Sequence, residues 1–147
     1  MDQIQTQKNS TKKTKKTKKN KKIFQLVATA AGDVVSKKGY VSVIDLFLRI
    51  GWLTSDNIVD WKSGKIPYLE RVITANLSKI SKAMKEFKSW AIHSKLKASF
   101  THYKHKSHKL RFSKTGELNI EIAYCTHYVL VKPEKRKIDN DFTNSEI

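Results

Sequence analysis

The chain has 147 residues, with 30 Lys and Arg residues against 13 Asp and Glu residues and a formal net charge of +17 at pH 7. Its single cysteine excludes an internal disulfide and favours a reducing compartment, and no apolar run is long enough to cross a bilayer. A small chain with this charge is expected to have an anionic partner.

Composition divides the chain into three parts. Residues 1–22 contain nine lysines and one aspartate, and residues 132–147 contain four basic and four acidic residues with few hydrophobic ones. Segments this polar cannot bury enough apolar surface to offset the entropy of ordering them. We therefore expect a disordered lysine-rich tail at 1–22, a single basic α+β domain at 23–131 and a disordered tail at 132–147.

The predicted domain begins with helices. Residues 23–38 are expected to form a short helix. Ser42 and Asp45 then have the spacing of a capping box, and apolar residues recur at helical spacing over 43–50. Gly51 follows as a left-handed stop. The pattern therefore predicts a short capped helix at 43–50.

A second short helix is expected over 55–63. Thr54 is its N-terminal cap, Asp56 lies in its first turn, and Gly64 ends it. Its buried side would consist of Ile58, Val59 and Trp61.

A third and longer helix is expected after Pro67, which suits a first helical position. From there an apolar stripe keeps a spacing of 3.6 residues to about Leu96, which predicts one long amphipathic helix, with Asn76 as the place where it would kink. The stripe consists of Leu69, Val72, Ile73, Leu77, Ile80, Met84, Phe87 and Ala91. Opposite the stripe, four lysines advance by three residues at a time: Lys79, Lys82, Lys85 and Lys88.

After Leu96 the pattern changes to one typical of strands. The runs KLRFS and ELNIEIAYCTHYVLV flank the turn signal at 114–116, and the second run alternates β-branched and aromatic residues. We expect a small antiparallel hairpin or meander here. A helical interpretation of 118–131 stays open, because Ile120, Ala123, Tyr124, His127 and Tyr128 also fit a period of 3.6.

The positive charge of the domain is concentrated in one segment. Residues 76–116 hold eleven Lys and Arg residues against one Glu, whereas residues 23–75 hold six against five. Ten excess charges on about forty residues repel one another unless an anionic partner neutralises them. Since lysines pair with phosphates and exposed aromatics stack on bases, we predict a non-enzymatic protein that binds DNA or RNA. The predicted contact residues are Lys79, Lys82, Lys85, Lys88, Trp90, His93, Lys95, Lys97, Tyr103, Lys104, His105, Lys106, His108, Lys109, Arg111 and Lys114.

The histidines at 102, 105 and 108 raise two other hypotheses. Together with Cys125 and His127 they are plausible zinc ligands by type, but their spacing sends successive side chains of an extended chain to opposite faces, and neighbouring lysines would repel a dication. We predict no metal site and no cofactor. A metal-free nuclease with a histidine base is a third alternative, for which Glu117 and Glu121 are the nearest orienting carboxylates.

The main rival to nucleic-acid binding is a protein–protein interaction module. Such a module would use the basic helix against an acidic partner, or would self-associate through the long helix. An apolar stripe on that helix that stays uncovered would favour it.

Residues 43–68 resemble the helix-turn-helix of mercury-resistance-type regulators and excisionases. The resemblance is carried by Ile50-Gly51, the Thr54 cap, Trp61 and the exit Gly64-Lys65-Ile66-Pro67. It implies that Ser55, Asn57 and Lys62 touch DNA. The chain departs from such helices in carrying Asp56 and Asp60, an unfavourable face for a major groove, and a helical hairpin that only builds core would fit the same residues.

Residues 39–131 also resemble a family of small, basic, uncharacterised bacterial proteins. The matching phrases are GWL, WKSGKIPYLERVITANLSKI and LRFS…IEIAYCTHY. The resemblance implies a bacterial cytoplasmic protein and supplies no activity. In a eukaryotic cell, the repeat TKKTKKTKKNKK would favour the nucleus.

Overall fold

The computed structural model describes residues 22–131, and its fold class is α+β, as predicted. A helix over residues 22–38 comes first. It is followed by α2 (Val43–Ile50), α3 (Ser55–Lys62), the 3-10 turn η1 (Leu69–Val72), α4 (Leu77–His93) and α5 (Leu118–Cys125). The two predicted tails lie outside the described residues, apart from Lys22, which is helical.

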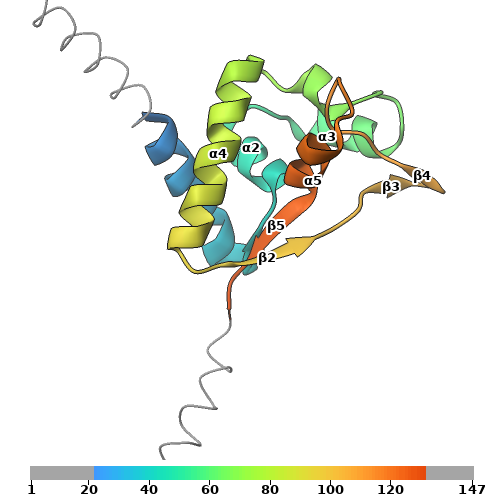
Figure 1. Cartoon of the computed structure of the whole chain (residues 1–147). Coiled ribbons are helices and arrows are strands. Elements are labelled where there is room, and N and C mark those ends of the chain that lie inside the picture. The colour runs from blue at the N-terminus through green and yellow to red at the C-terminus, as the bar shows by residue number, and fades with distance from the viewer. Residues whose placement is uncertain (1–21, 132–147) are drawn as a thin grey trace, which may run out of the picture.

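Two small antiparallel sheets complete the fold. The first has the order β1-β5-β2, built from β1 (Tyr40–Val41), β5 (Thr126–Val129) and β2 (Lys97–Phe100). The second is the hairpin of β3 (Lys104–His105) and β4 (His108–Lys109). Figure 1 shows α4 and the N-terminal helix on one side of the molecule, while the β3–β4 hairpin projects from the opposite side.

The helices α2 and α3 begin and end where the sequence predicts. Ser42 Oγ accepts a hydrogen bond from the Asp45 N–H at 3.0 Å, and the Asp45 carboxylate accepts one from the Ser42 N–H. Gly51 ends α2 with φ of +98°. Thr54 Oγ1 accepts the N–H of Asn57 at 3.2 Å and so caps α3. These signals are local, since each involves residues within one helical turn, and such signals can be read from the sequence.

One prediction for α3 is wrong. Ile58 and Trp61 are buried, but the Val59 side chain is 62% exposed. The helix has only eight residues, so its buried side is a narrow stripe, and Val59 falls outside it.

The prediction of one long helix from Pro67 to about Leu96 is also wrong. The chain forms only η1, runs extended through Ile73, and starts α4 at Leu77 with Asn76 as its N-cap. The backbone here finds partners outside a helix: the N–H of Glu70 donates to Phe112 O at 2.9 Å, and that of Thr74 donates to Trp52 O at 2.9 Å. Because these tertiary hydrogen bonds replace the i to i−4 ladder, the apolar period continues while the helix does not.

The strand prediction for 118–131 is correct only for its second half. Residues 118–125 form α5, and the chain then passes directly into β5 at Thr126. The run KLRFS is not a strand beyond Lys109, and the turn at Gly116 leads into α5. The strand partners of β5 are β1 and β2, so the hairpin expected around 114–116 does not form.

One part of the hydrophobic core joins α3, α5 and the segment between β4 and α5. Trp61 and Phe112 have ring centroids 4.8 Å apart, and Phe112 stacks on Tyr124 at 5.0 Å. The buried indole of Trp61 also donates from Nε1 to the carbonyl of Arg111 at 2.9 Å. This packing fixes the residues that follow the hairpin, and with them the direction in which the hairpin projects.

Among residues 22–131, no helix combines the length and the apolar character that crossing a membrane requires.

Candidate nucleic-acid interface

The four lysines of α4 are exposed, but they do not form one face. Each step of three residues rotates the side-chain direction by about 60°, so Lys79 and Lys88 point about half a turn apart. Lys79 and Lys82 line a groove of about 500 Å³ beside the N-terminal helix, together with Lys22. Lys88 lines a separate groove between α4, α5 and the sheet.

The β3–β4 hairpin brings the predicted residues of the histidine-rich segment together. Lys104 lies directly opposite Lys109, and His105 lies directly opposite His108. Lys106 at the turn has φ of +57°, a left-handed conformation. Lys104, Lys106, His108 and Lys109 are exposed, so the hairpin is a projecting ribbon with a cationic surface.

The hairpin is held against the end of α3. The ring of His105 lies so close to Gly64 that a Cβ there would be 3.1 Å from its Cδ2. Lys62 and Lys65, which flank this contact in the sequence, are exposed. The hairpin and the α3 exit are therefore neighbours in the fold, a relationship that the sequence does not reveal because forty residues separate them.

Tyr103 is a support of the hairpin rather than a free aromatic contact. Its ring packs on Trp61 at 5.6 Å and on Phe112 at 5.3 Å, and its hydroxyl pairs with His127 Nε2 at 2.8 Å. Burial raises the pKa of Tyr103 to about 12 and lowers the pKa of His127 below its ordinary value. The Tyr103 carbonyl also accepts the N–H of Leu110 at 2.8 Å, which closes the base of the hairpin.

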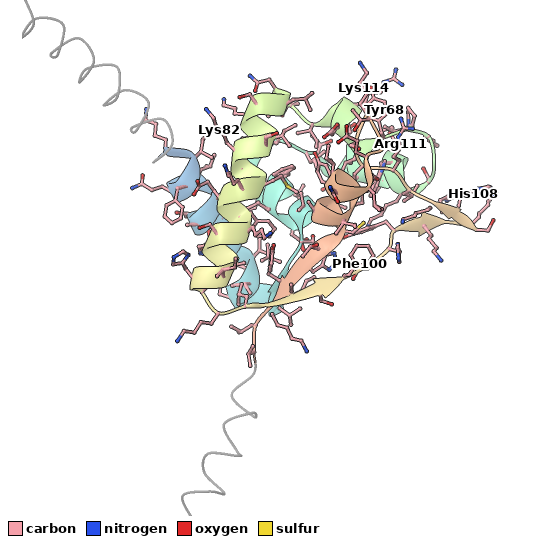
Figure 2. The ribbon with its side chains drawn as sticks, in the orientation of Figure 1. Tyr68, Lys82, Phe100, His108, Arg111 and Lys114 are labelled. Atoms are coloured by element: carbon pink, nitrogen blue, oxygen red, sulfur yellow. The ribbon has the colours of Figure 1, made fainter. Side chains whose placement is uncertain are left out.

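Arg111 is likewise engaged within the fold. Its Nε donates to Ser113 O at 3.0 Å, and one terminal nitrogen donates to Lys114 O at 3.2 Å. The guanidinium also lies over the ring of Tyr68, 5.4 Å from the centroid. Figure 2 shows Arg111, Lys114 and Tyr68 together near the turn that precedes α5. Arg111 thus stabilises that turn, whereas the side chain of Lys114 is exposed.

The remaining predicted residues lie around the C-terminal end of α4. Trp90 is half-buried and stacks on Phe87 at 6.3 Å, and His93 is exposed with Nδ1 2.8 Å from Ser89 O. Lys95 and Lys97 are exposed, Lys95 in the turn after α4 and Lys97 on β2. Figure 2 places Lys82 and His108 on opposite sides of the molecule. The sixteen predicted residues therefore do not make one continuous surface.

The α2–turn–α3 segment presents few groups to a partner. Ser55 and Lys62 are exposed and Asn57 is half-buried. The two helices are separated by the four residues 51–54, of which Leu53 is buried. The apolar side chain that α3 exposes most is Val59, which is followed by Asp60. Neither side chain is an amide of the kind that reads base edges.

A hydrogen-bond network that the sequence analysis did not predict stabilises the turn after the hairpin, at residues 112–114. The Glu121 carboxylate accepts the backbone N–H groups of Phe112 and Ser113 at 2.9 and 2.7 Å. Glu70 accepts the N–H of Lys114 at 2.9 Å and the hydroxyl of Tyr124 at 2.7 Å. Both carboxylates are thus occupied by internal donors, and the donors to Glu121 are backbone N–H groups and the Ser113 hydroxyl, not a histidine.

Over residues 22–131, no three His, Cys, Asp or Glu side chains come close enough together to hold a metal ion. His105 and His108 pair across the hairpin, while the ring of His102 packs edge-on against Phe100 at 4.6 Å. Cys125 is buried, and this burial raises the pKa of its thiol.

Comparison with models of known protein families, with curated proteins and with solved structures found no match to this chain.

Proposed function

We propose that this protein binds nucleic acid without catalysing a reaction, and that the β3–β4 hairpin contacts the phosphate backbone. The observation that carries the proposal is the pairing of Lys104 with Lys109 directly across the hairpin. Like charges in this position repel and destabilise a strand pair. An anionic partner that lies along the hairpin removes this cost, and phosphate groups of a nucleic acid supply closely spaced negative charges.

The ion pairs within the described residues do not include the hairpin lysines. Over the described residues the ion pairs are Lys38 with Asp45 and Arg49 with Asp33. Neither includes a basic residue of the segment 76–116. The positive charge of that segment is therefore not neutralised within the described structure, which supports an external partner.

The shape of the hairpin supports duplex DNA as the partner. A two-stranded ribbon fits the major groove of B-DNA, and its flanking lysines then reach the phosphates on either side. Lys62 and Lys65 beside the hairpin extend the same cationic surface. Helix α4, which carries the other lysines, lies on the opposite side of the molecule from the hairpin (Figure 1), so those lysines would contribute only long-range attraction.

The test compares two triple variants of the full chain that lose the same charge. One carries Lys104→Gln, Lys106→Gln and Lys109→Gln in the hairpin, and the control carries Lys79→Gln, Lys82→Gln and Lys85→Gln in α4. Fluorescence anisotropy with a labelled duplex, a single-stranded DNA and an RNA over a salt series gives the affinity and its salt slope.

We expect the hairpin variant to lose far more affinity than the control. Each neutralised duplex phosphate contributes about 0.9 to the salt slope, so the slope should fall by up to about 2.7. Equal losses in both variants would show that binding follows net charge and not the hairpin. An unmodified chain that binds none of the three nucleic acids at low salt would disprove the function itself.

A further inference from the structure

An apolar groove runs between α4 and α5. It consists of two adjoining hollows of about 420 and 410 Å³, which share Met84, Asn119 and Ala123 in their walls. One hollow continues to β2 and β5, where Ala98 and Tyr128 line it, and the other continues to the start of α4. Met84 therefore lies at the middle of one continuous groove.

The walls of this groove expose large apolar side chains. On α4, Leu77 and Ile92 are 60% and 62% exposed. On α5, Ile120 and Ile122 also line the groove, and Ile122 is 41% exposed. Scattered exposed apolar residues are ordinary, but a contiguous set around a hollow is typical of a surface that another segment covers.

The rim of the groove is basic. Lys88 lines it from α4 and Lys114 from the turn before α5. Lys85 is exposed and lies three residues before Lys88, so it neighbours that rim lysine on the surface of α4. The carboxylate in the wall is that of Glu70, and it is occupied by the Lys114 N–H and the Tyr124 hydroxyl. A segment that is apolar on one side and acidic at its edges would complement this groove.

We propose that residues 138–147 of this same chain bind in the groove. This stretch, IDNDFTNSEI, lies outside the described residues and contains three acidic residues and no basic one. Ile138 and Phe142 are four residues apart, a spacing that places both on one side of either a helix or a strand. Asp139 and Asp141 stand between them. The pair supplies apolar groups for the hollows, and the aspartates supply charges for the lysine rim.

The geometry of the chain allows this contact. The described chain ends at Val131, three residues after Tyr128, which lines one end of the groove. Residues 132–137 can span about 20 Å when extended, since each residue contributes at most about 3.3–3.6 Å. The two sides are joined by a short linker, so their effective concentration is high and even a weak contact becomes populated.

The experiment uses the two methionines of the chain, Met1 and Met84. In the full chain labelled with ¹³C at the methionine methyl groups, Met84 reports on the middle of the groove and Met1 serves as an internal reference. The test variant carries Ile138→Ala and Phe142→Ala. The matched control carries Thr143→Ala and Asn144→Ala in the same segment.

We expect the Met84 signal to move by more than its line width in the test variant and to stay in place in the control. The reason is that the ring current of Phe142, which would act on the Met84 methyl group in the groove, is removed in the test variant alone. Lys85→Gln with Lys88→Gln should move the same signal part of the way, whereas Lys79→Gln with Lys82→Gln should not. An unmoved Met84 signal in the Ile138→Ala, Phe142→Ala variant overturns the proposal. A Met84 signal of the unmodified chain that changes on dilution overturns it as well, since the segment would then come from a second copy.

Discussion

Glu121 of α5 holds Ser113 through two hydrogen bonds to the same carboxylate oxygen, from the Ser113 N–H at 2.7 Å and from the Ser113 hydroxyl at 2.6 Å. Ser113 is 1% exposed, so its donors have no access to bulk water. The other carboxylate oxygen of Glu121 accepts the Phe112 N–H at 2.9 Å. This single side chain therefore ties the segment after the hairpin to α5.

Replacement of Glu121 by alanine should strongly destabilise the fold. The variant leaves two backbone N–H groups and one hydroxyl without their acceptor, and hydrogen bonds to a charged group are worth about 1.5–3 kcal/mol each. Since the remaining structure can partly relax, we expect a loss of about 3 kcal/mol in the free energy of unfolding, measured by urea denaturation with tryptophan fluorescence.

Glu117→Ala is the matched control for this prediction. Glu117 stands at the start of α5 and makes no side-chain cap hydrogen bond. A surface change of this kind usually stays within about 0.5 kcal/mol. Similar losses in the two variants would contradict the role that the structure gives to Glu121.

The Glu121 network also explains why the structure of residues 109–131 could be predicted only in part. Ile120, Tyr124 and Tyr128 fit both a strand and a helix, so the apolar pattern alone left two interpretations open. The choice is made by the backbone N–H groups at 112 and 113, which need an acceptor that α5 presents at Glu121. Glu121 lies nine and eight residues after these two N–H groups, so the contact spans more than one helical turn and the apolar pattern does not reveal it.

The start of α4 gives a second prediction. Asn76 Oδ1 accepts the N–H of Lys79 at 2.8 Å and so satisfies one of the free donors of the first turn. Asn76→Ala should reduce the free energy of unfolding by about 1 kcal/mol. Ser78→Ala, in the exposed first turn, is the control and should stay near the parent value in the same urea experiment. An equal effect of both changes would exclude a capping role for Asn76.

A substitution in the turn after the C-terminal end of α4 should raise the stability of the fold. Leu96 N–H donates to Ala91 O at 3.0 Å and Lys95 N–H donates to Ile92 O at 3.1 Å, the pattern of a Schellman motif. The residue at its left-handed position is Lys95, with φ of +59°. A side chain is strained there, whereas glycine is not.

Lys95→Gly should therefore raise the free energy of unfolding by about 1 kcal/mol. Ser94→Gly is the control, because Ser94 has φ of −83° and gains nothing from the freedom of glycine. A thermal or urea midpoint that falls in the Lys95→Gly variant would show that the Lys95 side chain stabilises the turn in another way.

The sequence predicts that the candidate site is rich in lysine, but it does not predict which of these lysines share one surface. The excess of lysines over 76–116 is visible in the sequence, but α4 turns Lys79 and Lys88 to opposite sides. The aromatics among these lysines are divided in the same way, since Tyr103 is a support inside the fold while Phe100 is 46% exposed. Only the pairing of β3 with β4 shows that Lys104 and Lys109 face each other.

The burial of His127 beside Tyr103 makes the stability of the fold depend on pH. Burial lowers the pKa of His127 below its ordinary value of 6.5, and the coulombic effect of Asp45 only partly opposes this. Between the folded and the unfolded pKa values, the unfolded chain binds more protons than the folded chain. The free energy of unfolding therefore falls as the pH drops through 6.5, and it levels off below the folded pKa.

We expect the urea midpoint of the parent chain to be lower at pH 5.5 than at pH 7.5, and the difference to shrink in His127→Gln. Glutamine cannot be protonated, and its side chain can still pair with the Tyr103 hydroxyl. His93→Gln changes an exposed histidine and should keep the full difference. If His127→Gln retains the parent pH dependence and His93→Gln loses it, the half-buried His127 at the base of the hairpin is not the group that titrates.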